Sequence, residues 1–147
     1  MKKITLLLSL LLIAKFAVFA QSDDILGIWL TDEDKSQVRI FKATNGKYYG
    51  KIEWLKVDKD KKDIENPDPG LKDKPVLGLT ILKGFSYNED KKQWSGGTIY
   101  DPKEGKTYDC YMWFEGDNNV LQIKGYVLGM KFVGRKTTWR KEDKIRD

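Results

Sequence analysis

The sequence has no histidine and a single cysteine, Cys110, among its 147 residues. Histidine is the commonest general base and the commonest metal ligand, so its absence argues against zinc sites and against Ser-His-Asp or Cys-His nucleophiles. One thiol cannot form an intramolecular disulfide, so the hydrophobic core alone must hold the fold. The sequence therefore predicts a protein with no cofactor, no metal and no enzymatic activity. An enzyme that uses Asp or Tyr acid–base chemistry is the least favoured alternative.

Long hydrophobic runs are also scarce, with one exception at the start of the chain. Two lysines at 2–3 precede an apolar run at 4–14, and a segment of small residues ends at Ala20. This is the three-part pattern of a cleavable signal peptide over residues 1–20. Lys15 interrupts the segment, which falls short of the roughly 20 apolar residues that a membrane-spanning helix needs. We therefore expect export to the periplasm or secretion, and no transmembrane segment after cleavage.

Charge of one sign is not concentrated anywhere in residues 21–147. The formal net charge of the chain is +5, and three of its lysines belong to the predicted signal peptide. Basic and acidic residues are interspersed in the remainder, which argues against a nucleic-acid partner. The remainder has the length of one domain, so we expect a signal peptide at 1–20 and a single domain at 21–147.

Helical periodicity is missing as well, and short segments rich in β-branched and aromatic residues recur between Gly, Asn, Asp and Pro. This pattern predicts an all-β, antiparallel up-and-down meander of about eight strands. We expect the meander to close into a small barrel, because closure removes its two exposed edges. The expected strands are 27–30, 36–43, 47–56, 79–87, 93–100, 106–115, 120–127 and 131–140.

Several short segments carry more specific expectations. Asn45-Gly46 predicts a two-residue type I′ turn, in which both residues adopt positive φ. The charged, proline-containing segment 57–74 cannot be a central strand, and it is either a lid over one end of the domain or a mobile surface excursion. Gly96-Gly97 is typical of a bulge or bend in a barrel strand. Cys110 alternates with large apolar residues, which predicts a buried, inert thiol.

The most specific block of the sequence is WSGGTIYDP, at residues 94–102. Together with KSQVRI at 35–40 and GLTILKGF at 78–85, it resembles a family of exported bacterial proteins designated domain of unknown function 2147 (DUF2147). The resemblance runs in order from about Gly27 to Arg140. It implies a single β domain and export, and it implies no activity, because none is established for the family.

A second resemblance concerns the two ends of the predicted barrel. Gly27-Ile28-Trp29 in the first expected strand and Trp139-Arg140 in the last look like the arrangement in lipocalins and fatty-acid-binding proteins. In those barrels a Trp of the first strand closes one end and is covered by a basic side chain of the last strand. The resemblance implies the same roles for Trp29 and for the basic residue of the second pair, Arg140.

The preferred hypothesis is a non-enzymatic, lipocalin-like protein that binds a small apolar or amphipathic ligand at the barrel mouth. An anionic head group is expected to be oriented by Arg39, Arg135 and Arg140, and the expected apolar lining comprises Trp29, Trp54, Tyr108, Met112 and Trp139.

The alternative hypothesis is a protein-interaction module of the cell envelope. It would dock its partner through an exposed aromatic face or through the 57–74 loop. Small eight-stranded barrels can be filled by their own side chains. An internal cavity would favour the ligand-binding hypothesis, whereas a packed interior beside exposed aromatic side chains would favour the interaction module.

Overall fold

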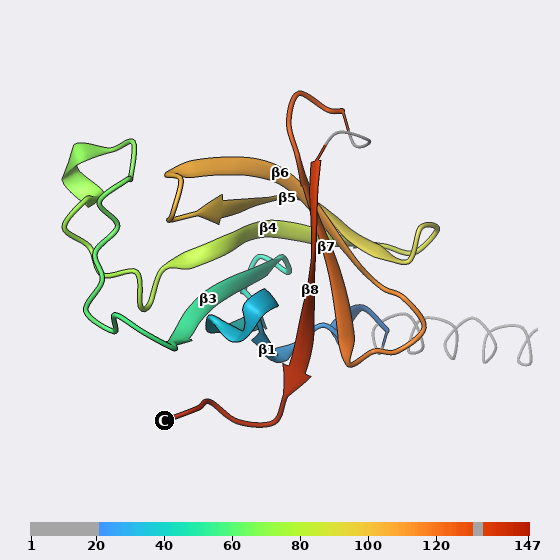
Figure 1. Cartoon of the computed structure of the whole chain (residues 1–147). Helices are drawn as coiled ribbons and strands as arrows, with labels where there is room; N and C mark the ends of the chain where they lie inside the picture. Colours follow the sequence, from blue (N-terminus) through green and yellow to red (C-terminus); the bar gives the residue numbers. More distant parts are fainter. Residues whose placement is uncertain (1–20, 131–133) are drawn as a thin grey trace, which may run out of the picture.

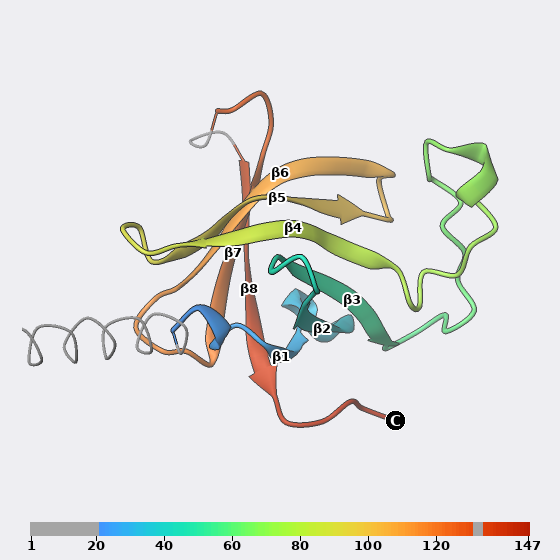
Figure 2. The ribbon, with the colours of Figure 1, turned by 180° about the vertical axis from the view of Figure 1, so that it is seen from behind.

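The computed structural model of the chain describes residues 21–130 and 134–147. These residues form a closed antiparallel barrel in which each strand pairs with its sequence neighbours and the last strand pairs with the first (Figure 1, Figure 2). The strands are β1 (Gly27–Leu30), β2 (Ser36–Lys42), β3 (Tyr48–Leu55), β4 (Thr80–Asn88), β5 (Gln93–Asp101), β6 (Lys106–Phe114), β7 (Val120–Tyr126) and β8 (Gly134–Glu142).

The prediction of an eight-stranded barrel is confirmed. Every expected segment is a strand, and most strand ends lie within one residue of their predicted place. The predicted start of the last strand, at 131–133, lies outside the described residues, and β8 continues two residues beyond Arg140. The signal peptide predicted for residues 1–20 also lies outside the described residues. No described helix is long and apolar enough to cross a membrane.

The barrel interior is filled by the inward-pointing residues of the strands. Successive residues of a strand point to opposite faces, so every second residue enters the core. On β6 these residues include Cys110 and Met112, and both are buried. Burial alone raises the pKa of the Cys110 thiol to about 12, so the thiol is protonated and inert at neutral pH, as predicted. The largest fully buried side chains include Trp29, Trp94, Phe85, Leu30, Ile40, Leu82, Leu121 and Ile123.

One end of the barrel is closed by residues 22–26, which precede β1. Two buried indoles donate hydrogen bonds to the backbone of this segment. Trp29 Nε1 donates to the carbonyl oxygen of Ile25 at 2.8 Å, and Trp94 Nε1 donates to that of Ser22 at 3.0 Å. A buried indole N–H needs such a partner, so the two tryptophans fix the segment across the barrel end.

A basic residue of β8 covers Trp29, but it is not Arg140. Lys141 Nζ lies 5.4 Å above the Trp29 ring and donates to the carbonyl oxygen of Asp24 at 2.9 Å. Arg140 points to the other side of β8, where its guanidinium donates to Asp34 at 2.7 Å. The assignment of Arg140 to this role is wrong by one residue, because neighbouring strand residues face opposite sides of the sheet.

The prediction of a type I′ turn at Asn45-Gly46 is also wrong. Of the two residues only Gly46 has a positive φ, 77°. The Gly46 N–H donates to the Ala43 carbonyl at 2.9 Å, and the Ala43 N–H donates to the Lys47 carbonyl at 2.9 Å. The connection is therefore a β-turn that ends in a left-handed glycine, a common alternative in hairpins. Asn45 contributes through its side chain, which accepts from the Lys47 N–H at 3.0 Å.

The bulge predicted at Gly96-Gly97 is confirmed. The register of β5 against β6 shifts between Trp94 and Gly97. A Cβ atom at Gly97 would lie only 2.6 Å from the ring of Phe85, so the core leaves no room for a side chain there. The bulge bends β5 around Phe85 and helps the sheet to close.

The segment between β3 and β4 is attached to the barrel by a buried polar cluster. Asp63 is completely buried, and its carboxylate accepts the hydrogen bond of the Tyr100 hydroxyl, whose oxygen lies 2.8 and 3.0 Å from the two carboxylate oxygens. Asn66 Nδ2 donates to the same carboxylate at 2.7 Å. Beyond this anchor the segment forms a short 3-10 turn, η2 (Pro69–Leu71), and extends past the ends of β3 and β4 (green in Figure 1). Its base is thus fixed to one end of the barrel.

The closing role of Trp94 can be tested with a matched pair of substitutions. Trp94→Phe removes the indole donor to Ser22 from the core, and we expect the free energy of unfolding to fall by about 2–4 kcal/mol. Trp54→Phe removes a bond of the same length, 3.0 Å to the Asp147 carbonyl, at an exposed position. That change should cost less than about 1 kcal/mol. Urea denaturation measures both losses, and equal losses would contradict the assigned role.

The anchor at Tyr100 predicts a specific pH dependence. Burial, followed by the hydrogen bond to Asp63, raises the pKa of Tyr100 to about 12 from 10.0. The stabilisation by the protonated phenol is therefore fully present below pH 10 and is lost as the pH rises toward 12. Tyr100→Phe should be less stable than wild type at neutral pH, and the difference should shrink through this interval. If urea denaturation gives the same difference in stability between wild type and Tyr100→Phe throughout this pH interval, the assigned role of the Tyr100 phenol is refuted.

Candidate functional site

Several connections surround the end of the barrel opposite residues 22–26. They are η1 (Asp32–Asp34) after β1, the segment 56–79 after β3, the turn 102–105 after β5, and the connection that leaves β7 at Val127. We refer to this end as the mouth. A ligand site was expected here from the sequence.

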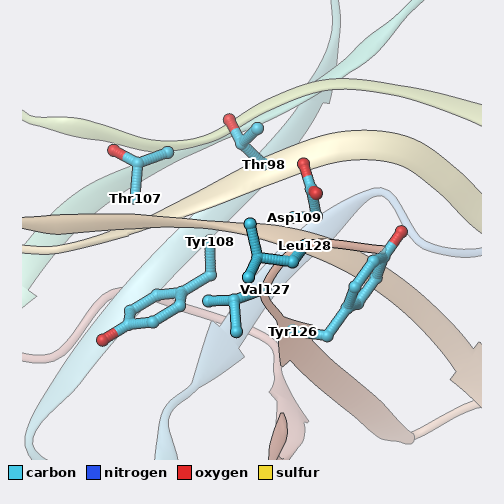
Figure 3. A pocket seen from close by; sticks show the side chains of 7 residues that line it. All are labelled: Thr98, Thr107, Tyr108, Asp109, Tyr126, Val127 and Leu128. Carbon is cyan, nitrogen blue, oxygen red and sulfur yellow. The ribbon is translucent and has the colours of Figure 1, made fainter. Parts of the chain in front are cut away.

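A hollow of about 240 Å³ lies beside the mouth, where β5, β6 and the end of β7 meet (Figure 3). The register sets Thr98 of β5 beside Asp109 of β6, and Asp109 beside Tyr126 of β7. Three strands therefore build one wall. The hollow, here named the tyrosine hollow, is lined by Thr98, Thr107, Tyr108, Asp109, Tyr126, Val127 and Leu128.

The two ends of the tyrosine hollow differ in chemistry. Asp109 lies on the side of Tyr126, and the phenol of Tyr108 extends toward the opposite side (Figure 3). The Tyr108 hydroxyl donates to Glu104 at 2.6 Å. This hydrogen bond and, to a lesser extent, burial raise the pKa of Tyr108. The same hydrogen bond is the largest of the effects that lower the pKa of Glu104. Tyr108 is thus a neutral phenol and Glu104 a carboxylate at neutral pH.

The structure does not bring the three predicted arginines together. Arg39 lies on the outside of β2, where its Nε donates to Glu53 at 2.7 Å. Arg140 binds Asp34, also at 2.7 Å. Of the three arginines, Arg135 lies at the mouth. Its positive charge is near enough to Tyr108 to oppose part of the rise in the pKa of that phenol.

Arg135 reaches this position through the strand register. It pairs with Gly125 of β7, and a Cβ atom at Gly125 would lie 3.5 Å from the Cβ of Tyr108. Because Gly125 has no side chain, nothing from β7 separates β8 from Tyr108 at this level. Tyr108 and Arg135 are therefore the two predicted site residues that share a location.

The other predicted lining residues lie elsewhere. Trp29, Met112 and Trp139 are buried in the core. Trp54 lies on the outside of β3, where its indole binds the Asp147 carbonyl and the Arg146 guanidinium sits 5.5 Å above its ring. These four side chains do not line the tyrosine hollow.

The packing of the interior explains why the hollow lies outside it. Trp94 contacts the rings of Tyr87 and Phe114, with centroids 4.9 and 5.1 Å away. Trp29 stacks on Phe114 at 6.0 Å. A ligand inside the barrel would have to displace these rings. A second hollow, of about 390 Å³, lies on the β3–β4 segment and is lined by charged residues at 58–61, which gives it no apolar wall.

Aromatic side chains also gather on the outside of the barrel. Tyr111 stacks on Trp113 at 5.3 Å and contacts Tyr126 at 6.0 Å. Lys136 Nζ lies 5.2 Å above the Trp113 ring. The three rings are half-buried and a lysine covers one of them, so the aromatic face expected from the sequence is only partly exposed. We refer to Tyr111, Trp113 and Tyr126 as the aromatic face.

Sequence reasoning did not single out most of the hollow. Thr98, Thr107 and Asp109 are polar residues on the outer side of strands, a position with no distinctive pattern. Val127 and Leu128 follow β7 in a connection. The residues that line the hollow become neighbours only through the register of three strands. The one signal that the sequence offers is the apolar pair Val127-Leu128 directly after a strand.

Acid–base chemistry has little support in the described residues. Tyr48 donates to Asp23 at 2.7 Å, where the carboxylate also accepts from Lys42, and Tyr100 donates to Asp63 at 2.8 Å, where the pair anchors the β3–β4 segment. Within residues 21–130 and 134–147, no group of three or more Asp, Glu or Cys side chains is placed to hold a metal ion.

Comparison with known proteins agrees with this architecture. The family model described as "Uncharacterized protein conserved in bacteria (DUF2147)" matches residues 27–141. Among solved structures, the chain is similar to protein HP1028 from the human pathogen Helicobacter pylori, which is described as belonging to the lipocalin family. The TM-score is 0.71 and the identity 27%, over 81% of this chain and 83% of that one. A search of the curated proteins finds no match.

Proposed function

The chain belongs to the DUF2147 family of uncharacterised bacterial proteins and has a lipocalin-like barrel, and on this premise we propose that it binds a small apolar or amphipathic molecule without chemical conversion. The ligand occupies the tyrosine hollow at the mouth and not the barrel interior. Export by the signal at residues 1–20 would make it a binding protein of the periplasm or the exterior.

The wall of the tyrosine hollow is the observation that carries this proposal. Tyr126, Val127 and Leu128 offer apolar surface, and Thr98 and Thr107 offer hydroxyl groups beside it. Small-molecule sites combine an apolar lining with a few polar groups in this way. The volume of about 240 Å³ is below the roughly 300–1,000 Å³ of most ligand pockets, so it suits a small molecule or one end of a longer one.

The charges around the hollow orient such a ligand. Arg135, Lys103 and the exposed Lys106 stand on the Tyr108 side around the Glu104 carboxylate, and we expect these three cations to favour an anionic head group there in spite of that acid. Asp109 stands on the other side and would repel an anion, but it can accept a hydrogen bond from a hydroxyl group. The arrangement supports an amphipathic anion with its head group toward Tyr108 and Arg135.

A second function, docking of an envelope protein, is supported by a different part of the molecule. The β3–β4 segment exposes Val57, Ile64 and Leu71 while Asp63 anchors its base to the barrel. Exposed apolar side chains on an anchored loop are a feature of protein-interaction sites. This candidate and the ligand site occupy different loops and do not exclude each other.

Native mass spectrometry of protein purified gently from its own host tests the ligand-binding proposal. We expect a stoichiometric small molecule on the wild-type protein. Thr98→Trp should fill the tyrosine hollow from β5 and yield apoprotein. Thr44→Trp adds the same ring at an exposed turn on the far end of the barrel and should keep the ligand. Clean apoprotein in every wild-type preparation, or full occupancy in Thr98→Trp, would contradict the proposal.

A further inference from the structure

Residues 143–147, which follow β8, are bound to the outside of the barrel. They run from the end of β8 toward β3 (Figure 1), where Trp54 Nε1 donates to the carbonyl oxygen of Asp147 at 3.0 Å. The Arg146 guanidinium lies 5.5 Å from the centre of the Trp54 ring. We refer to residues 143–147 as the strap.

A buried glutamine of β2 binds the backbone of the strap. Gln37 is completely buried. Its Nε2 donates to the carbonyl oxygen of Lys144 at 3.0 Å, and its Oε1 accepts from the N–H of Arg146 at 2.7 Å. The same Nε2 also donates to the carboxylate of Glu142, the last residue of β8. A buried amide needs such partners, so the position of Gln37 is stable only while the strap is in place.

The order of the strands takes the strap across β1. In the closed sheet β1 lies between β8 and β2. The strap begins at β8 and binds β2 through Gln37 and β3 through Trp54, so it must pass over the outer side of β1. Arg146 also binds back to Glu142 of β8, with its Nε and terminal nitrogen 3.2 and 2.6 Å from the two carboxylate oxygens. The strap therefore spans the seam at which β1 pairs with β8.

The outer side of β1 is apolar and buried. Trp29 points into the core, so its neighbours Ile28 and Leu30 point outward. They are nevertheless only 6% and 1% exposed. Ile145 of the strap is itself half-buried. Outward side chains of a barrel strand are buried only when another part of the chain covers them, and the strap crosses the barrel at this strand. Burial of this apolar surface adds to the hydrogen bonds that hold the strap.

We propose that the strap keeps β1 in the barrel, so that release of the strap opens the sheet between β1 and β8. The seam is the place where such an opening costs least, because β1 pairs with β8 at three positions, whereas β6 pairs with β7 at six. Opening there would uncover Trp29 and give access to the packed interior, which the closed barrel denies. This inference does not require the tyrosine hollow to hold a ligand.

Native-state amide hydrogen exchange, followed by NMR, tests the inference. The chain from Gln21 onward contains every described element and is the protein to use. Gln37→Ala removes the side chain that binds the strap backbone. We expect the amides at the seam, 28–30 and 140–142, to exchange about tenfold faster relative to those of β6 in this variant. Arg146→Ala changes an exposed residue and leaves the barrel intact, and it should accelerate the same amides about threefold.

Two control variants remove similar interactions away from the seam. Gln122 is a buried glutamine of β7, 7% exposed, whose Oε1 accepts a hydrogen bond from a threonine of β8. Lys136 matches Arg146, because its Nζ lies 5.2 Å from the centre of the Trp113 ring and 3.3 Å from the Glu115 carboxylate. Gln122→Ala and Lys136→Ala should leave the ratio of exchange between the seam and β6 as it is in wild type.

The ratio of exchange between the seam and β6 separates local opening from a general loss of stability. A faster exchange confined to the seam in Gln37→Ala and Arg146→Ala would support the role of the strap. Three results would each overturn it: an equal acceleration of the seam and β6 in both variants, unchanged exchange at the seam in both, or the same seam-specific acceleration in the two controls.

Discussion

Closure of the barrel depends on β1, a four-residue strand that pairs with β2 on one side and with β8 on the other. Its pairing with β8 covers only three positions, from Ile28 to Leu30. The short strand nevertheless brings Trp29 into the core, where Lys141 covers the ring and Ile25 accepts the indole proton. The segment before β1 also accepts a hydrogen bond from the Trp94 indole. β1 therefore closes the sheet, and the residues directly before it close one end of the barrel.

Residues 22–26 close one end of the barrel, and the proposed ligand site lies at the opposite end. The rings of Trp29, Tyr87, Trp94 and Phe114 pack against one another in the core with centroids 4.9 to 6.0 Å apart, which is why we propose recognition at the outer wall and the mouth. Leu128, which lines the tyrosine hollow, is 87% exposed.

The fold could be predicted from the sequence because its strands alternate and its turns carry Gly, Asn, Asp and Pro. The site could not, for reasons of register. One residue separates Arg140 from Lys141, and it decides which of them covers Trp29. Composition cannot show that Arg39 is engaged by Glu53, since that pair joins two strands. Tyr108 and Arg135 could be predicted individually, but their proximity follows from the absence of a side chain at Gly125.

We propose that this lipocalin-like barrel recognises its ligand outside its packed interior. The most direct measurement is a methyl NMR titration of the chain from Gln21 with decanoate, a small amphipathic anion. We expect saturable shifts at Val127 and Leu128, which line the tyrosine hollow, and unchanged signals from Met112 and Leu82 in the core. Shifts centred on Met112 and Leu82 would show that the interior opens to the ligand and would rule out recognition at the tyrosine hollow.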